Sequence, residues 1–308
     1  MNLLEAIVLG IVEGITEYLP VSSTGHLILA SSLMGLTERV DKDSLDAFNI
    51  VIQGGAILAV LGLYRARVWQ MIQGLLGRDA VGLRLAVNVT AAFMPAAILG
   101  VLLAGTIKRY LFFPLPVLSA LAAGGVVMIA IDRWQDRRFQ KTPDPHDPRT
   151  YTDLEGLPLR GALLIGLLQC LAMWPGTSRS MVTIVGGMLA GMKPRQAAEF
   201  SFILGLPTLG AACAYSLLKN LAGDAPNMFE TLGTAPMLAG LIVATVSAAV
   251  AVSWLVSFLT RHGLSPFGWY RLVLCVVMGA LIWQGAVTIS PEEAIPATPL
   301  ASPATTTE

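Results

Sequence analysis

The sequence predicts an all-α polytopic membrane protein with an inverted-topology repeat, built from about six transmembrane helices plus two re-entrant helical hairpins. Three observations support this prediction. Of the 308 residues, 55% are hydrophobic and only 13% are charged, whereas soluble domains are roughly one-quarter charged. The mean hydropathy is +0.68. The apolar residues form long runs, and proline followed by clustered hydroxyl residues interrupts two of them.

Charge and cysteine content exclude several classes of protein. Twenty Lys and Arg balance twenty Asp and Glu, so no net charge favours nucleic acid or another polyanion. Three widely separated cysteines (Cys170, Cys213 and Cys275) lie in apolar runs and are expected to be buried hydrophobic residues rather than disulfides or metal ligands. The start of the chain has Glu5 and no basic segment, so no cleavable signal peptide is expected.

Six runs are apolar for about the 20 residues that a helix needs to cross the hydrocarbon core. They are 47–64, 85–106, 114–132, 198–218, 235–259 and 269–288.

Two further apolar regions, 3–35 and 160–192, are broken by "LPVSST" and "WPGTSRS". Irregular backbone at membrane depth is tolerated only where protein or a water-filled cavity covers it. Both regions are therefore predicted to be re-entrant helical hairpins.

Basic residues predict the orientation, because cytoplasmic loops are enriched in Lys and Arg. Four arginines between 65 and 84, and a second basic group between 133 and 141, place those loops inside. The first hairpin then enters from outside, whereas the second, between Arg160 and Lys193, enters from inside. The two halves run in opposite senses.

This scheme divides the chain into four parts. A first repeat (1–134) and a second repeat (159–288) each contain one broken hairpin and three spans, joined by a cytoplasmic polar linker at 135–158. Residues 289–308 are predicted to be a disordered tail. Glycines in "GGAIL" and "GGMLAG" allow close helix packing, and a homodimer is plausible.

The first break follows a pair of acids. Glu13 and Glu17 are four residues apart and share one face of a helix. Their mutual repulsion at membrane depth has to be offset by a cation, water or a bound proton. A divalent ion such as Mg²⁺ or Ca²⁺ suits paired oxygen ligands. The alternative is that this helix borders a solvated vestibule.

Hydroxyl residues and a histidine follow the acids. Ser22, Ser23, Thr24 and His26 lie within five residues. A hydroxyl near an imidazole is the usual arrangement of an activated nucleophile. For Ser22 and Ser23, capping of the following helix is the structural alternative.

The second break contains Arg179, which is the one cation between Arg160 and Lys193. Its planar fork suits a pair of phosphate oxygens. Hydroxyls and backbone N–H groups at a helix start complete an anion cradle, formed by Gly176, Ser178, Ser180 and Thr183. The alternative is a structural ion pair with one of the acids of the first break.

If the two breaks meet, they bring together acids, hydroxyls, an imidazole and a guanidinium. Phosphoryl transfer requires such a set, because it needs an attacking oxygen and neutralisation of the phosphoryl charge. A site within the bilayer suggests a phosphate carried on a lipid. Transport is the rival hypothesis, because broken helices between inverted repeats also occur in transporters.

The two motifs resemble those of the undecaprenyl-diphosphate phosphatase family of bacteria, also called bacitracin-resistance proteins. "EGITE" with "LPVSSTGH" and "PGTSRSMVT" carry the resemblance, which covers roughly residues 3–288. It implies hydrolysis of C55 polyprenyl diphosphate to the monophosphate, which recycles the peptidoglycan lipid carrier. A multi-pass location in the inner membrane, a periplasmic active site and a divalent cation are also implied.

The resemblance also assigns roles. It places the acidic pair on Glu13 and Glu17, the hydroxyl and histidine on Ser23 and His26, and phosphate binding on the second break. Two mechanisms stay open. In one, Ser23 attacks the terminal phosphate with His26 as base; in the other, a metal-bound water attacks and Ser23 only donates a hydrogen bond.

Overall fold

A computed structural model describes residues 1–139, 152–222, 231–287 and 289. The described residues form helices and connecting turns, without strands. Six helices are long and apolar enough to cross a membrane, which confirms the predicted number of spans. They are α4 (Lys42–Leu63), α6 (Ala80–Leu111), α7 (Pro114–Phe139), α10 (Pro194–Ala222), α12 (Thr234–His262) and α13 (Ser265–Trp283).

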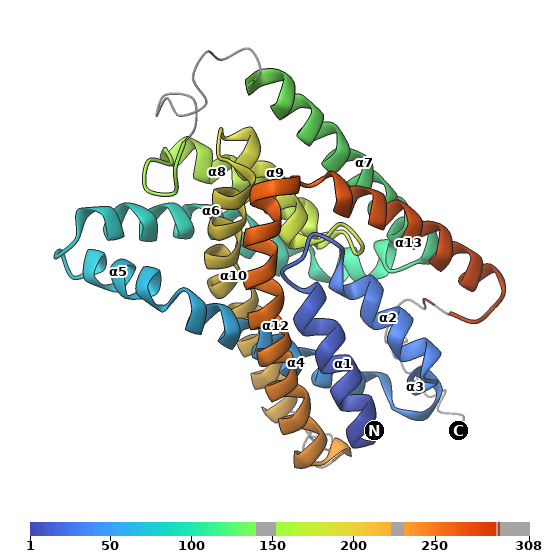
Figure 1. Cartoon of the computed structure of the whole chain (residues 1–308). Coiled ribbons are helices and arrows are strands. Elements are labelled where there is room, and N and C mark those ends of the chain that lie inside the picture. Colours follow the sequence, from blue (N-terminus) through green and yellow to red (C-terminus); the bar gives the residue numbers. More distant parts are fainter. Residues whose placement is uncertain (140–151, 223–230, 288, 290–308) are drawn as a thin grey trace, which may run out of the picture.

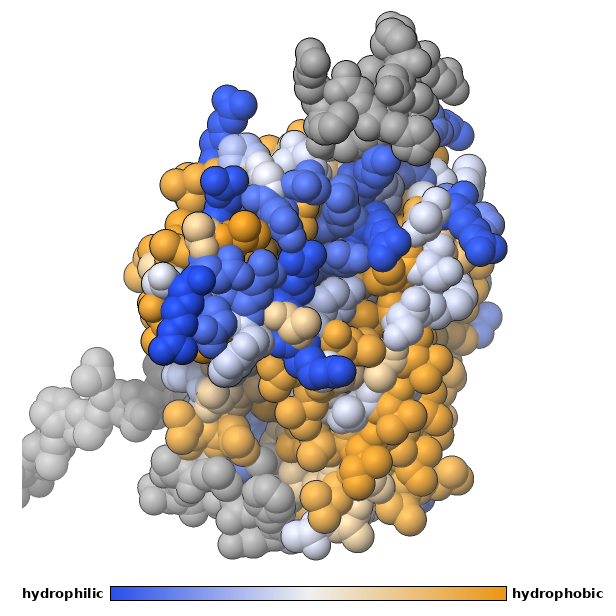
Figure 2. Space-filling view, turned by 60° about the vertical axis from the view of Figure 1, so that its left-hand side comes forward, coloured by the Kyte–Doolittle hydropathy of each residue, from blue (hydrophilic) through white to orange (hydrophobic). Residues whose placement is uncertain are grey.

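The outer surface is apolar. Val101 in α6 is 85% exposed and Val276 in α13 is 73% exposed, and many other large apolar side chains are exposed with them, whereas soluble monomers rarely expose large contiguous apolar patches. Figure 2 shows hydrophilic residues gathered toward one end of the visible face and hydrophobic residues over much of the opposite part. A lipid environment explains this surface, so the chain is a multi-pass membrane protein.

The two apolar regions with a predicted interruption are each divided into two helices. The first has α1 (Leu3–Thr16) and α2 (Ser23–Leu33), followed by the short α3 (Leu36–Arg39). The second has α8 (Leu159–Gln169), the 3₁₀ turn η1 (Cys170–Met173) and α9 (Arg179–Leu189). We call residues 17–22 the first break and residues 174–178 the second break. The re-entrant course of these helices and the inverted repeat stay predictions.

Helices from the two halves pack against each other. Helix α1 lies along α12, α8 lies along α6, α7 lies beside α13, and α4 contacts α10. In Figure 1 the α7–α13 pair runs along one side of the molecule, and the end of α1, the start of α2 and α9 lie toward its middle. This packing brings both breaks to the interior.

Small residues allow α1 to lie close to α12. A Cβ atom on Gly10 would lie 2.7 Å from the Gly240 carbonyl oxygen, and one on Gly14 would lie 2.5 Å from that of Ala244. The glycines of "GGAIL" and "GGMLAG" also serve packing within the chain: Gly55 lies against α12, and Gly187 against α10. The homodimer stays a prediction.

The structure differs from the sequence prediction in two connections. Residues 65–84 were expected to be a loop, but they include helix α5 (Arg65–Leu75), which packs against α6. Helix α7 continues to Phe139, so the first residues of the predicted linker 135–158 are helical. Residues 140–151 of that linker lie outside the described residues, as does nearly all of the predicted tail 289–308.

Candidate active site

The acidic pair lies at the C-terminal end of α1. Glu13 and Glu17 are only 1% and 6% exposed. The Glu17 amide donates to the Glu13 carbonyl at 2.9 Å, as the last helical bond before the first break. The helix stops there because Pro20 lacks an amide proton and restricts the residue before it. Both carboxylates are therefore held inside the protein, next to irregular backbone.

Ser23 forms a hydrogen bond with the second acid. Its Oγ donates to Glu17 Oε2 at 2.8 Å. Ser22 precedes it with φ of 76°, a left-handed conformation that strains a residue with a side chain. Ser22 is the N-cap residue of α2 but makes no side-chain capping bond, so the capping alternative is wrong for its hydroxyl. The twist at Ser22 turns the Ser23 side chain back toward the end of α1.

His26 is bound to other groups. Its Nδ1 lies 2.8 Å from the Ser22 carbonyl oxygen and its Nε2 lies 2.7 Å from the Tyr270 hydroxyl. The two rings are parallel to within 4°, with centroids 5.7 Å apart. Both ring nitrogens are thus occupied, and His26 is not joined to Ser23. Thr24, the remaining hydroxyl residue predicted for substrate binding, has an exposed side chain.

The second break has the same kind of backbone twist. Gly176 has φ of 92°, and its missing Cβ would lie 2.5 Å from the Val117 carbonyl oxygen. Ser178 has φ of 75° and caps α9 by accepting from the Met181 amide at 3.4 Å. Its Oγ lies 3.0 Å from that of Ser180. The loop therefore turns tightly against α7 and presents the start of α9.

Arg179 joins the second break to the first. Its Nη2 donates to Glu17 Oε1 at 3.0 Å, in an ion pair whose side chains are 10% and 5% exposed. Its Nη1 donates to the Ser201 carbonyl at 3.0 Å, and its Cζ lies 5.2 Å from the centre of the Tyr18 ring. One carboxylate, Glu17, thus bridges the hydroxyl of the first break and the guanidinium of the second.

Two hydroxyls strengthen this contact. Ser180 Oγ donates to the Leu19 carbonyl at 2.9 Å, which joins the two breaks directly. Thr183 Oγ1 lies 2.6 Å from Ser201 Oγ and donates to the Arg179 carbonyl at 2.8 Å. Ser180, Thr183 and Ser201 are all fully buried. These two predicted hydroxyls therefore contact protein groups, and they support the backbone around Arg179.

Several buried polar atoms at this site have no protein partner. Within the described residues, they include Glu13 Oε2, Tyr18 Oη and Arg179 Nε. Buried polar groups are normally hydrogen-bonded, so each such exception needs an explanation. Three of them beside one ion pair indicate a place where a polar ligand or water completes the bonding.

The described residues contain no group of three or more His, Cys, Asp and Glu side chains that could hold a metal ion. Glu13 and Glu17 form a set of two carboxylates, and both Glu17 oxygens already have protein partners. Mg²⁺ often takes only one or two carboxylates together with water and substrate phosphates. The pair fits such a shared site, and Glu13 Oε2 is its free oxygen.

Sequence reasoning missed four residues near the breaks. Tyr18, Ser201, Tyr270 and Arg271 contact the site residues or the breaks directly. Arg271 had a detectable signal, because a lone arginine within an apolar span is a functional candidate by default. Tyr18 lies within the first break itself, directly after Glu17, whereas Ser201 and Tyr270 are ordinary polar residues in helices whose sequence neighbours give no signal.

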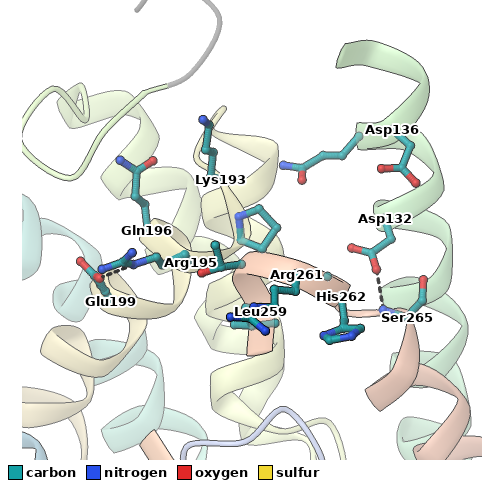
Figure 3. A pocket seen from close by; sticks show the side chains of 14 residues that line it. Asp132, Asp136, Lys193, Arg195, Gln196, Glu199, Leu259, Arg261, His262 and Ser265 are labelled. Carbon is teal, nitrogen blue, oxygen red and sulfur yellow. Dashed lines mark hydrogen bonds and ion pairs between the residues drawn. The ribbon is translucent and has the colours of Figure 1, made fainter. Parts of the chain in front are cut away.

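A separate polar pocket of about 1160 Å³ lies where α7, the start of α10 and the α12–α13 turn meet. None of the predicted site residues lines it. Figure 3 shows Asp132 pointing at the start of α13 and Arg195 pairing with Glu199. Asp132 accepts from the amides of Leu264, at 2.6 Å, and Ser265. This pocket therefore contains the anchor that fixes the beginning of α13.

Comparison with known proteins identifies relatives over nearly the whole chain. A family model described as "Bacitracin resistance protein BacA" matches residues 6–277. A protein of Sorangium cellulosum named undecaprenyl-diphosphatase is 44% identical over 280 residues, which cover 90% of this chain and 84% of the relative. Two others are each 42% identical: undecaprenyl-diphosphatase of Polaromonas naphthalenivorans, covering 93% and 97%, and undecaprenyl-diphosphatase 2 of Rhodospirillum rubrum, covering 94% and 98%.

Proposed function

This chain belongs to the bacitracin resistance protein BacA family, and we propose that it is an undecaprenyl-diphosphatase. It hydrolyses C55 polyprenyl diphosphate to the monophosphate and inorganic phosphate. The observation that carries this proposal is the chain of contacts from Ser23 through Glu17 to Arg179. The Ser23 hydroxyl, the Glu17 carboxylate and the Arg179 guanidinium lie together at the contact of two broken helices, which supports roles as nucleophile, base and phosphate-binding fork.

We further propose that Glu17 takes the proton of Ser23. The Ser23 hydroxyl donates to this carboxylate, whereas both nitrogens of His26 have other partners. Ser23 Oγ would form a bond to the terminal phosphorus while the anhydride P–O bond breaks and releases polyprenyl monophosphate. Water then hydrolyses the phosphoserine. In the alternative, water attacks the phosphorus and Ser23 donates a hydrogen bond.

Arg179 is proposed to hold the substrate phosphate. In the structure its fork binds Glu17 and a backbone carbonyl, and its Nε has no partner in the described part of the chain. A phosphate with two or three negative oxygens competes well for a guanidinium, because bidentate charge-assisted bonds are strong. Transfer of Arg179 from Glu17 to the phosphate would also free Oε1 of Glu17 as the reaction begins.

We propose that Glu13 and Glu17 would hold a divalent cation, Mg²⁺ or Ca²⁺. Such an ion would supply charge neutralisation on the diphosphate. Glu13 has a buried carboxylate oxygen that lacks a partner among the described residues.

The family and the topology support a cellular role. We propose an inner-membrane location with the active site toward the periplasm, because the basic connections between spans are expected on the opposite, cytoplasmic side. The reaction would recycle the lipid carrier of peptidoglycan synthesis and confer bacitracin resistance. A lipid-phosphate flippase is the alternative function. It needs only a charged site between the halves, whereas the Ser23 to Glu17 hydrogen bond favours hydrolysis.

The test is phosphate release from detergent-solubilised C55 diphosphate, with and without Mg²⁺ or Ca²⁺. Wild type is compared with Glu17→Gln and Arg179→Ala. Both variants should lose nearly all activity. Breaking a buried ion pair can destabilise a protein by about 3–5 kcal/mol, so each variant is first checked for a single folded species. No release by well-folded wild type would refute the enzymatic function and lead to a flipping assay in liposomes.

A further inference from the structure

Arg271 in α13 has an unusual set of partners. Its side chain is fully buried, and all five of its N–H groups donate to backbone carbonyls. The acceptors are Leu121 and Ala120 in α7, at 3.1 Å each, Pro20 in the first break at 3.4 Å, and Thr177 and Gly176 in the second break at 2.9 and 2.8 Å. Within the described residues, no carboxylate pairs with it.

These contacts fix the orientation of the peptide planes in the second break. In a peptide unit the C=O and the following N–H point in opposite directions. Because the carbonyls of Gly176 and Thr177 face Arg271, the amides of Thr177 and Ser178 face away from it. The Thr177 amide is used within the turn, donating to the Trp174 carbonyl at 3.1 Å. The Ser178 amide therefore points away from Arg271 with no acceptor among the described residues.

The next two amides belong to the first turn of α9. Those of Arg179 and Ser180 likewise have no acceptor within the described part of the chain. Three successive free amides at a helix start, after a residue with positive φ, form a cradle for an anion. Arg179 is the first residue of α9, so its side chain starts beside these amides. Arg271 thus binds one side of the second break, and the other side presents the free amides and the Arg179 guanidinium.

We propose that Arg271 is a positioning residue for diphosphate hydrolysis, an inference that rests on the proposed function. It fixes the peptide planes of both breaks at once, so that the amides at the start of α9 meet the substrate phosphate beside Ser23. It also places a positive charge, uncompensated by any carboxylate, behind the phosphate site. A lysine keeps the charge but has three donors on one atom, so it cannot reproduce the five contacts.

The first test replaces Arg271 itself. Arg271→Lys and Arg271→Met are compared with wild type for kcat, for KM of C55 diphosphate and for inhibition by methylenebisphosphonate, a diphosphate analogue without a lipid tail. We expect kcat of Arg271→Lys to fall at least 30-fold and inhibition to weaken at least ten-fold. A folded Arg271→Lys variant with wild-type kcat and inhibition would overturn the proposal.

A second pair of variants leaves Arg271 in place, in case its replacement prevents folding. A Cβ on Gly124 in α7 would lie 2.5 Å from Arg271 Nη2, whereas one on Gly125 would lie 2.8 Å from the Gly268 carbonyl oxygen. Both changes disturb the contact between α7 and α13, but only Gly124→Ala displaces the guanidinium. Gly124→Ala should lose at least ten-fold in kcat and in inhibitor affinity, and Gly125→Ala less than three-fold.

Equal activities for the two glycine variants would overturn the assignment, because the effect would then belong to helix packing in general. Melting temperatures measured in the same detergent separate loss of fold from loss of positioning. The proposed function is tested independently by wild type. If wild type releases no phosphate, the enzymatic function fails; if it does and the Arg271 and Gly124 variants match it, only the positioning role fails.

Discussion

The position of Arg179 can be tested by adding a single methyl group. Gly205 in α10 lies directly against this side chain: a Cβ there would be 2.7 Å from Nη1 and 3.1 Å from both Cζ and Nη2. To reach ordinary contact at 3.4 Å, Nη1 has to move by about 0.7 Å. The guanidinium is the flexible end of a long side chain, so it moves and α10 keeps its place.

A shift of this size would break the hydrogen bonds that the Arg179 guanidinium donates. The bonds to Glu17 and the Ser201 carbonyl are 3.0 Å long, and a displacement along either one would lengthen it to about 3.7 Å, beyond hydrogen-bonding range. Misplacing a catalytic group by 1 Å can reduce a rate about 100-fold. We therefore expect Gly205→Ala to lower kcat/KM by about 10- to 100-fold while the protein stays folded.

The assay is phosphate release from C55 diphosphate by purified protein, with the melting temperature measured in the same detergent. Gly210→Ala is the matched control, because it lies in the same helix and its Cβ would meet nothing within 4 Å. Its activity should stay within two-fold of wild type. Full activity of Gly205→Ala would refute the reasoning that the observed position of Arg179 matters for the reaction.

Three further predictions follow from the site and its surroundings. Ser23→Ala should abolish turnover, and retention of a tenth of the rate would favour direct attack by water. Tyr270→Phe removes the hydroxyl that binds His26 Nε2, and such a hydrogen bond contributes about 0.5–1.5 kcal/mol. The kcat should therefore fall about two- to ten-fold. An unchanged pH–rate profile would count against any role for this contact. Backbone N–H groups, that of Gly82 first, hold the pKa of Asp79 below its ordinary value. The ionised Asp79 side chain therefore stabilises the fold fully above about pH 4, and this stabilisation is lost as the pH falls through the lowered pKa. Melting temperatures of Asp79→Asn should depend less on pH between 3 and 6 than those of wild type.

The six spans could be predicted from the sequence because lipid requires about 20 apolar residues in succession, and few soluble helices have them. The breaks were equally visible, since proline and clustered hydroxyls cannot continue an apolar helix. Helix α5 was missed because it has four polar side chains in eleven residues and lies beside α6 rather than crossing as a span.

The hydrogen-bond partners of the site residues were harder to predict from the sequence than the site residues themselves. Sequence proximity favoured a pair of Ser23 with His26, three residues apart. The left-handed backbone at Ser22 instead turns Ser23 toward Glu17, and such a backbone angle at a serine has no sequence signature. The bonds of Arg271 depend on the meeting of α7, α13 and both breaks, which only the three-dimensional packing shows.

The left-handed backbone at Ser22 and Ser178 determines when the free-energy cost of ordering the site is incurred. A non-glycine residue held at φ near +75° stores roughly 1–3 kcal/mol, and each of these two precedes a helix that presents reacting groups. That free energy is supplied once, when the chain folds, so the site is preorganised and substrate binding does not have to distort it. Glycine at position 22, where the serine makes no side-chain capping bond, would relieve the strain and raise stability, but the site would then have to be ordered in every catalytic cycle.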